Sequence, residues 1–575
     1  MYIIKNIYLS SNAPEQATYA ASELRYYLSL MCGKSIPVQN EPVDNAVLLD
    51  QVACPKLGED GFKLIPEKSA IRIQGGKRGI IYGAYELLEM LGCRFFTPEC
   101  EKIPILTQIE VNLNTEITQV PVFEYREHDY TDLHRSPRFA LKRRMNGDDH
   151  PIPEKLGGHL SYVWYVHTFD KLVPTSIYGE SHPEYYAMLE DGSHPVKPQR
   201  NQLCLTNPEV LEISIDSVRK ALKANPTARI ISISQNDWPY NCKCEKCLAI
   251  DKEEGSAAGT LLRFINSIAE RLEPEFPDVI FDTLAYQYTR PAPKVTRPRH
   301  NVCVRLCSIE ACFSHPFEAC DDDSRKITRP DGTESSFIND LREWGLASDR
   351  NYIWDYTTCF GHYAAPHPNW RVLAPNMKSF AENNVKGVFE QANRAAGGGV
   401  DLNELRAYII TKLLWDPNTD VDRHMQEFTD YYYGAAGVYI REYIDTLCDK
   451  VEKDNIHVGF NDNPTSELFS EDMLDKYDAI LTKAEAAVAG DALRTRRVQK
   501  ARLSIRWVHM KRAAMLRGVR DAEEINAFFT DLNSFGITRI DEWVPHPYTL
   551  RALLEDKWRG VEYLNHWTDE RVEIL

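Results

Sequence analysis

Short β-rich runs recur between residues 120 and 415, separated by helical or loop segments, and this alternation limits the folds open to the chain. The runs are "VFEYREHDY", "FALKRRMNG", "YVWYVHTF", "ARIISISQND", "VIFDTLAYQY", "VCVRLCSIE", "NYIWDY" and "GVFEQ". Eight such runs alternating with helices predict an α/β fold of the (β/α)8 TIM barrel type. A further strand-like piece, "QLCLTN", is assigned to a loop of the third barrel unit.

The segments on either side of the barrel predict two further domains. Residues 1–118 contain the strand "YIIKNIYLS" and the helices "PEQATYAASELRYYLSLMC" and "RGIIYGAYELLEMLG", the second of which ends at Gly92. Long amphipathic segments such as "RTRRVQKARLSIRWVHMKRAAMLR" follow residue 416. We therefore expect a small α/β domain at 1–118, the barrel at 119–415 and a helical domain at 416–575.

Charge and composition narrow the choice of partners. The chain of 575 residues carries a formal net charge of -17 at pH 7, which argues against nucleic acid or an anionic membrane as the main partner. No uninterrupted apolar run reaches the roughly 18 residues of a membrane helix, and the first residues lack the basic start and apolar core of a secretory signal. We expect a cytoplasmic protein with a small or neutral partner, unless a signal segment precedes the given sequence. The sequence leaves the oligomeric state open.

The ends of the predicted barrel strands carry mostly acidic and aromatic residues. Active sites of such barrels lie at the carboxyl ends of the strands, where the following loops converge. The residues at these ends are Glu127, His128, Asp129, Asn146, His167, Asn236, Asp237, Trp238, Tyr286, Tyr288, Glu310, Trp354, Asp355, Glu390 and Gln391. Two carboxyl groups can protonate a leaving oxygen and stabilise an oxocarbenium-like centre, while aromatic faces stack on sugar rings. The ring therefore predicts a sugar-binding site and an oligosaccharide or glycan partner.

Each of these residues also has a structural interpretation. A strand-end carboxylate can cap the next helix or pair with an arginine such as Arg305. Trp238 and Trp354 can be ordinary core aromatics, and His167 and His362 fit hydrogen-bonded structural histidines as well as contacts to sugar hydroxyls. Four or more carboxylates at one barrel mouth favour chemistry over these structural roles.

Three cysteines, Cys242, Cys244 and Cys247, stand in the tight spacing C-x-C-x-x-C after the fourth run. Fourteen cysteines in 575 residues make no disulfide framework, so this cluster is the exception that needs a reason. Three thiolates can supply three corners of a tetrahedral zinc site, with a distant Cys or His as the fourth. The alternative is three buried thiols at the start of a helix. A zinc ion here would be structural, and we expect no cofactor for catalysis.

The chain resembles glycoside hydrolase family 163, first catalogued as a bacterial domain of unknown function. The resemblance rests on "SQNDW" with "CKCEKC", "LAYQYTRPAPK", "RLCSIEACFSHP", "YIWDYTTCFGHY" and "GVFEQ" followed by "DLNELRAYIITKLLWDP", and it covers roughly residues 120 to 430. The N-terminal segment resembles the domain that precedes the barrel in family 20 hexosaminidases and family 67 α-glucuronidases. The resemblance implies an endo-β-N-acetylglucosaminidase that cuts the chitobiose core of N-glycans with retention.

Family 20 enzymes place an Asp-Glu pair after the fourth barrel strand. The Asp orients the 2-acetamido group of the substrate, whose oxygen attacks the anomeric carbon, and the Glu is the acid/base. This chain departs from the pattern, because the matching position reads Asn236-Asp237. One assignment has Asn236 or Asp237 holding the acetamido group with Glu310 as acid/base, and the other makes Asp237 the acid. We favour the first, because Glu310 has a longer side chain on a separate strand end.

The complete prediction names Asp237, Glu310, Asn236 and Glu390 as catalytic. The predicted substrate-binding residues are His128, His167, Trp238, Tyr286, Tyr288, Trp354, Asp355, His362 and Gln391. Three rival functions remain: an exo-acting hexosaminidase, an α-glucuronidase-like hydrolase, and a non-catalytic carbohydrate-binding barrel. An α-glucuronidase would need a basic pocket for the uronate, which the ring of strand ends lacks.

Overall fold

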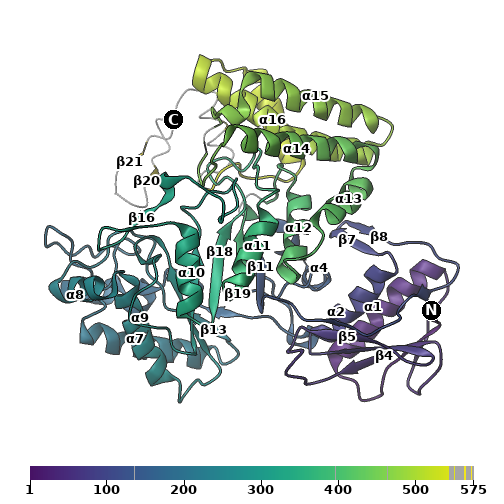
Figure 1. The fold of residues 1–575 in the computed structure, drawn as a ribbon, viewed down its shortest axis with the longest axis horizontal. Coiled ribbons are helices and arrows are strands. Elements are labelled where there is room, and N and C mark those ends of the chain that lie inside the picture. Colours follow the sequence, from purple (N-terminus) through teal and green to yellow (C-terminus); the bar gives the residue numbers. More distant parts are fainter. Residues whose placement is uncertain are drawn as a thin grey trace. The chain divides into compact units, whose positions relative to one another are not determined.

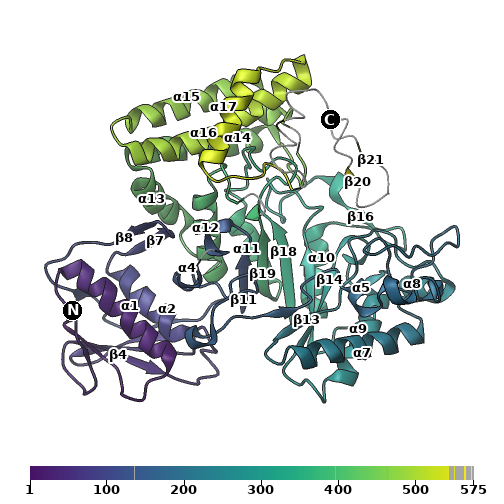
Figure 2. The same cartoon turned by 180° about the vertical axis from the view of Figure 1, so that it is seen from behind.

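The computed structural model describes residues 1–134, 136–394, 397–462 and 464–542, residue 550, and the short strands β20 (Tyr563–Leu564) and β21 (Arg571–Val572). The chain forms two compact units. The first contains residues 1–159, 402–441 and 482–498, and the second contains residues 160–401, 442–481 and 499–575. Figures 1 and 2 show the ribbon from opposite sides.

A six-stranded sheet with two helices forms the N-terminal part of the first unit. Its strand order is β10-β5-β6-β4-β2-β3, with β6, β4, β2 and β3 parallel and with β5 antiparallel to both β6 and β10. Helices α1 and α2 pack against each other and against the sheet. Ile80, Ala84 and Leu88 on the apolar face of α2 are fully buried. Both helices were expected from the sequence. The elements are β1 (Tyr2–Ile3), β2 (Asn6–Tyr8), α1 (Glu15–Cys32), β3 (Val38–Gln39), β4 (Ala46–Gln51), β5 (Phe62–Pro66), β6 (Ala70–Gly75), α2 (Gly79–Met90), β7 (Arg94–Thr97), β8 (Cys100–Lys102), β9 (Glu110–Val111) and β10 (Ile117–Gln119).

The segment predicted as the second barrel strand is a helix. Residues 139–147 were expected to be extended, but α4 covers Pro137–Lys142. Ser136 caps this helix, because its hydroxyl accepts a hydrogen bond from the backbone N–H of Phe139 at 3.3 Å, and Pro137 occupies the first helical turn. Ser at the N-cap followed by Pro is a strong helix-start signal, which outweighs the apolar run behind it. The neighbouring elements are β11 (Tyr125–His128), α3 (Thr131–His134), α12 (Asn403–Trp415) and α13 (Val421–Tyr432).

The second unit is built on a curled, parallel, half-barrel sheet. Its strands lie in the order β19-β18-β15-β14-β13-β12, and every neighbouring pair is parallel. All carboxyl ends therefore meet at one edge. The strands are β12 (Tyr162–Val163), β13 (Ile230–Ser232), β14 (Ile280–Ala285), β15 (Val302–Cys307), β18 (Asn351–Tyr356) and β19 (Val385–Gln391). The first five of these strands each lie within a run predicted to be a strand, whereas β19 begins two residues before its predicted run "GVFEQ".

Helices cover the sheet and continue into a helical C-terminal region. Helix α9 packs on β14 and β15, and α11 packs on β19. The α-helices are α5 (Phe169–Leu172), α6 (Thr175–Tyr178), α7 (Pro208–Ala224), α8 (Glu245–Glu254), α9 (Ala258–Leu272), α10 (Phe337–Ala347), α11 (Leu373–Glu382), α14 (Gly437–Asp454), α15 (Glu471–Ala487), α16 (Ala492–Arg517) and α17 (Ala522–Ser534). Shorter elements are the hairpin β16 (Ile327–Thr328) and β17 (Glu334–Ser335) and the 3-10 turns Glu154–Leu156, Pro183–Tyr185, Gln287–Thr289, Asp323–Arg325, Gly434–Ala436 and Glu467–Phe469.

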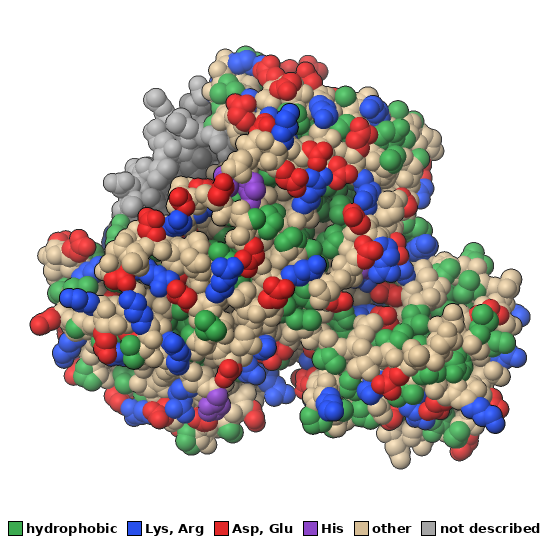
Figure 3. All heavy atoms as spheres, viewed as in Figure 1, with side chains coloured by type: hydrophobic (Ala, Val, Ile, Leu, Met, Phe, Trp, Pro, Cys, Tyr) green, Lys and Arg blue, Asp and Glu red, His purple; other side chains and the backbone are tan. Residues whose placement is uncertain are grey.

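The predicted helical segments after residue 416 are helical as far as the structure describes them. The predicted 416–575 domain is described up to residue 542 except for residue 463, and most of residues 543–575 lie outside the described residues. Among the helices that the structure describes, none has the length and apolar character needed to cross a membrane. On the face shown in Figure 3, acidic and basic side chains are interspersed over the surface.

Candidate active site

Two predicted acids lie at the carboxyl edge of the curled sheet, close to one buried tyrosine. Asp237 follows β13, Tyr286 directly follows β14 and Glu310 follows β15. The Tyr286 hydroxyl donates a hydrogen bond to Asp237 Oδ1 at 3.1 Å. Burial, together with the negative charges of Asp237 and Glu310, raises the pKa of Tyr286 well above its usual value. The structure therefore brings Asp237, Tyr286 and Glu310 into one electrostatic neighbourhood.

Glu310 is held by a buried arginine. Arg290 Nη1 donates to Glu310 Oε2 at 3.1 Å, and the other guanidinium nitrogens donate to Asp340 Oδ2 at 2.7 Å and to the backbone oxygen of Ser335 at 2.9 Å. The Arg290 side chain is fully buried, whereas that of Glu310 is 28% exposed. Burial raises the pKa of the Glu310 carboxyl, and Arg290 opposes part of that rise. Glu310 is thus fixed in orientation and partly exposed, and its pKa lies above the usual value for a glutamate.

Sequence reasoning missed Arg290 and Tyr356 as parts of this neighbourhood. Tyr356 is the last residue of β18. Burial and nearby groups that include Glu310 and Asp237 raise the pKa of Tyr356 well above its usual value. Both residues stand inside motifs already noted, "LAYQYTRPAPK" and "YIWDYTTCFGHY", but no spacing rule singles them out.

Two more predicted binding residues, His167 and Trp354, lie close to Tyr286, and a third, Gln391, bonds to Trp354. The side chains of Leu284, Tyr286 and Cys307 form a buried cluster, against which Trp354 packs. Trp354 Nε1 donates to Gln391 Oε1 at 2.8 Å. The His167 ring centroid lies 6.3 Å from that of Tyr286, and its Nδ1 lies 2.8 Å from the backbone oxygen of Gln235. His167 has a positive φ of 53°, a strained conformation that is frequent at functional sites.

The contacts of Asn236 and Trp238 are made to residues other than Asp237, Tyr286 and Glu310. The Asn236 amide donates to the backbone oxygen and to Oδ1 of Asn201, at 2.9 and 3.1 Å. Gln202 Nε2 donates to the backbone oxygens of Asn236 and Trp238, at 2.8 and 2.6 Å. Trp238 is only 6% exposed and packs edge-on against Tyr240. These contacts stabilise the turn that presents Asp237.

Asp355 and Glu390 form a second, deeper pair of acids. They are register partners on β18 and β19, so their side chains share one face of the sheet. Burial raises the pKa of Asp355 to about 6, and the Ser308 hydroxyl donates to its Oδ1. Burial and the charge of Asp355 raise the pKa of Glu390 well above its usual value. Glu390 is 1% exposed, and among the described residues neither of its oxygens has a hydrogen-bond partner.

Three predicted binding residues lie elsewhere. His128 belongs to β11 of the first unit, where it is fully buried and accepts a hydrogen bond from the backbone N–H of Tyr130 at 3.1 Å. The His362 ring lies 6.0 Å from Trp507, and burial, together with Lys511, lowers the pKa of His362 to about 3. Tyr288 lines a cavity together with Cys242 and Cys247 of the cysteine cluster, and burial raises the pKa of its phenol well above the usual value.

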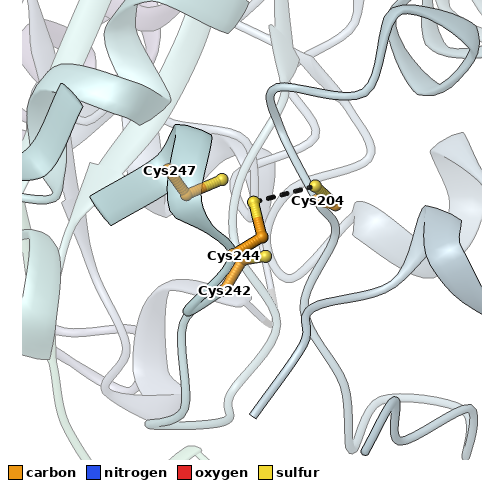
Figure 4. Close-up of side chains that lie close together, drawn as sticks. All are labelled: Cys204, Cys242, Cys244 and Cys247. Atoms are coloured by element: carbon orange, nitrogen blue, oxygen red, sulfur yellow. Dashed lines mark hydrogen bonds between the residues drawn. The ribbon is translucent and has the colours of Figure 1, made fainter. Parts of the chain in front are cut away.

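The three predicted thiols meet a fourth, Cys204, which the sequence analysis missed. Their sulfur atoms all lie within 4.8 Å of one another, and Cys204 Sγ lies 3.8 Å from Cys244 Sγ. Figure 4 shows Cys204 on one chain segment, with Cys242, Cys244 and Cys247 on the segment that enters α8. Two sulfurs of a tetrahedral zinc site are separated by roughly 3.8 Å, since each Zn–S bond is about 2.3 Å long. Cys204 stands in "QLCLTN", which the sequence analysis assigned to a loop.

A comparison with protein families shows to which family the chain belongs. Residues 95–445, more than half of its length, match the family model described as "Domain of unknown function (DUF4838)". The chain belongs to this family. Residues 3–106 match "Glycosyl hydrolase family 20, domain 2", which confirms the predicted likeness of the N-terminal segment to family 20 enzymes. The resemblance of this DUF4838 protein to glycoside hydrolase family 163 stays a prediction. A search of curated proteins gives no match.

The solved structures to which the chain is similar include glycoside hydrolases. A family GH115 4-O-methyl-alpha-glucuronidase with specificity for decorated arabinogalactans is 12% identical with a TM-score of 0.56, over 92% of this chain and 75% of that one. The GH20 β-N-acetylhexosaminidase from Streptomyces coelicolor A3(2) is 12% identical with a TM-score of 0.39, over 76% and 92%. The GH20 exo β-N-acetylglucosaminidase from Vibrio harveyi is 12% identical with a TM-score of 0.41, over 77% and 75%. The GH115 likeness shows that this DUF4838 chain has a glycoside hydrolase-like fold.

Proposed function

We propose that the chain is a retaining glycoside hydrolase that cleaves β-N-acetylglucosaminide linkages by substrate-assisted catalysis. The observation that carries the proposal is the arrangement of Asp237 on the Tyr286 hydroxyl beside Glu310 on the Arg290 guanidinium. One acid accepts from a neutral donor and the other is held by a cation, so their environments differ. Such a division is typical of acid pairs with separate catalytic roles. The family 20 domain at residues 3–106 supports an N-acetylhexosamine substrate.

The reaction proceeds in two steps. Asp237 accepts a hydrogen bond from the acetamido N–H of the substrate and turns the acetamido carbonyl oxygen toward the anomeric carbon. That oxygen forms a bond to the anomeric carbon while Glu310 donates its proton to the leaving glycosidic oxygen, so the glycosidic bond breaks and gives a free alcohol and an oxazolinium ion whose N–H still donates to Asp237. Glu310, now a carboxylate, takes a proton from a water molecule that attacks the anomeric carbon and reopens the ring. Two inversions at the same carbon give net retention.

The surrounding groups suit these steps. Tyr286 keeps Asp237 in place throughout, because its hydroxyl donates to Oδ1 and leaves Oδ2 for the substrate amide. Arg290 keeps Glu310 oriented in both protonation states, since a guanidinium remains charged at every working pH. Trp354, the partly exposed aromatic residue of β18, adds a face against which a pyranose ring can stack.

We extend the proposal to endo action on N-glycan-type oligosaccharides, because the family 163 resemblance implies it. The test is incubation with a panel of N-glycans, N-acetylglucosaminides and uronides, with products identified by mass. An endo enzyme leaves one N-acetylglucosamine on the peptide, whereas an exo enzyme removes single terminal sugars. A thiazoline analogue of the oxazoline should inhibit. Turnover of uronides alone, or binding without turnover, would refute the proposal.

For the cluster of Cys204, Cys242, Cys244 and Cys247 we propose a structural zinc ion. Four thiolates fill a tetrahedral zinc shell and leave no position for substrate. Gln202 stands two residues before Cys204 and bonds the backbone of the turn at Asp237. The metal would thus stabilise the loops behind Asp237 and take no part in bond cleavage.

A further inference from the structure

A second cluster of metal-binding side chains lies directly after Glu310, outside the four-cysteine cluster. Cys312, Cys320 and His457 each offer one ligand atom, and these atoms all lie within 4.8 Å of one another. Cys312 Sγ lies 3.5 Å from His457 Nδ1, and Cys320 Sγ lies 3.8 Å from the same nitrogen. Cys312 is buried, and both cysteines are free thiols.

These separations match the edges of a zinc tetrahedron. Bonds of about 2.3 Å to sulfur and about 2.0 Å to nitrogen place a sulfur and a nitrogen ligand roughly 3.5 Å apart. His315 adjoins this group without belonging to it: its Nδ1 lies 3.4 Å from Cys312 Sγ, and the centroids of the His315 and His457 rings are 4.5 Å apart, so a rotation of its side chain would supply the fourth ligand. Two thiolates and two imidazoles form a donor set that selects zinc over harder cations such as Mg²⁺ or Ca²⁺.

The far side of His457 is also arranged as in metal sites. Its Nε2 lies 3.2 Å from Asp321 Oδ1, while Nδ1 points at the two sulfurs. A histidine that binds a metal through one ring nitrogen commonly donates the other N–H to a carboxylate, which fixes the tautomer and strengthens the ligand. This contact is independent of the sulfur geometry and points to the same function.

The backbone already holds the two segments together. The Phe313 N–H donates to the Val458 oxygen at 2.8 Å, the Ser314 hydroxyl donates to the Ile456 oxygen at 2.8 Å, and the Val458 N–H donates to Ser314 Oγ at 3.0 Å. These hydrogen bonds hold His457 next to Cys312, although the two residues are 145 positions apart in the chain.

We propose that Cys312, His315, Cys320 and His457 bind a second structural zinc ion, with Asp321 supporting His457. This ion ties the loop that carries Glu310 to the segment after α14. The inference does not rest on the proposed glycosidase activity, because metal content is measured without substrate.

The first experiment is elemental analysis of the full chain purified without chelator. We expect about two zinc ions per chain, one in each cluster. Cys320→Ser and His457→Asn should each reduce this to about one, and Cys244→Ser should remove the other. The matched controls are Cys32→Ser in α1 and His300→Ala, whose side chain is 71% exposed, and both should keep two. One zinc in the unaltered chain, unchanged by Cys320→Ser, would overturn the proposal.

A second measurement uses the unaltered chain, so it remains informative even if a variant fails to fold. X-ray absorption at the zinc edge of the unaltered chain should give an average shell of about three sulfurs and one nitrogen, the mean of a four-sulfur and a two-sulfur, two-nitrogen site. A pure four-sulfur shell would overturn the second site. So would a Cys312–Cys320 disulfide found by mass after denaturation and thiol alkylation.

Discussion

Two loops at the carboxyl edge of the curled sheet each carry one candidate catalytic acid and members of one thiol cluster, but they differ in how the acid and the thiols are held. In the β13 loop (residues 233–244), Asp237 accepts a hydrogen bond from a neutral phenol, and the other thiols of the cluster are Cys204 in an earlier loop and Cys247 in α8. In the β15 loop (residues 308–322), Glu310 is held by a buried guanidinium, and the cluster reaches to His457 beyond α14.

The different surroundings of Asp237 and Glu310 indicate different roles in the proposed reaction. An anion that must orient an amide needs a hydrogen-bond donor but no competing cation, and Tyr286 supplies that to Asp237. A group that must gain and lose a proton needs a fixed position in both states, and Arg290 supplies that to Glu310. The second cluster links the Glu310 loop to His457, a residue distant in sequence, and so restricts movement of that loop. Such restriction is important for the residue that transfers the proton, because a displacement of about 1 Å can cost a large part of the rate.

The largest effect is expected from Glu310→Gln in the β15 loop. Loss of the proton donor should raise the barrier for natural glycans by roughly 3 to 4 kcal/mol, a factor of several hundred in turnover. Steady-state kinetics on a defined glycan measures it. Glu318→Gln, an exposed position in the same loop paired with Arg342, is the control and should act like the unaltered enzyme. Normal turnover by Glu310→Gln would show that the β15 loop does not carry the proton donor.

The next effect concerns stability, because Ser308 joins the β15 loop to Asp355. Burial raises the pKa of Asp355 from 3.8 to about 6, so between these values the folded chain holds a proton that the unfolded chain releases. Stability should therefore fall as pH rises from about 4 to about 6, by on the order of 3 kcal/mol. Asp355→Asn should flatten this slope in denaturant titrations at several pH values.

The control for that prediction is Asp278→Asn, at an exposed position, which should leave the slope as it is. An unchanged slope in Asp355→Asn would show that the carboxyl is not buried as described. Glu390 shares the pair, so Glu390→Gln should also reduce the slope while sparing turnover far more than Glu310→Gln does.

The smallest effect is expected in the β13 loop from Tyr286→Phe. Removal of one hydrogen bond to a carboxylate should cost roughly 1.5 kcal/mol of transition-state stabilisation. Since acetamido orientation is needed whatever the leaving group, the loss should be equal for glycans and for activated aryl glycosides. Tyr240→Phe in the same loop, 42% exposed, is the control. A loss confined to glycans would place Tyr286 with Glu310 in proton transfer instead.

The sequence predicted much of this picture, and the failures have physical reasons. Strand runs and the acids at their ends follow from local patterns, and so did Cys242, Cys244 and Cys247. The Ser136-Pro137 cap was overlooked behind an apolar run, which produced a false strand. Arg290, Cys204 and His457 escaped because their partners are distant in sequence. Nothing in the sequence showed that Glu390 is buried and Glu310 is open, since exposure is set by tertiary packing.

The division of roles between Asp237 and Glu310 is tested most directly by one comparison of leaving groups. The kcat/KM values of Asp237→Asn and Glu310→Gln are measured on a natural glycan and on an aryl N-acetylglucosaminide whose leaving group needs no proton. Asp237→Asn should lose activity on both substrates alike. Glu310→Gln should lose several hundred-fold on the glycan and far less on the aryl glycoside. Equal losses in Glu310→Gln, or a glycan-only loss in Asp237→Asn, would contradict the account.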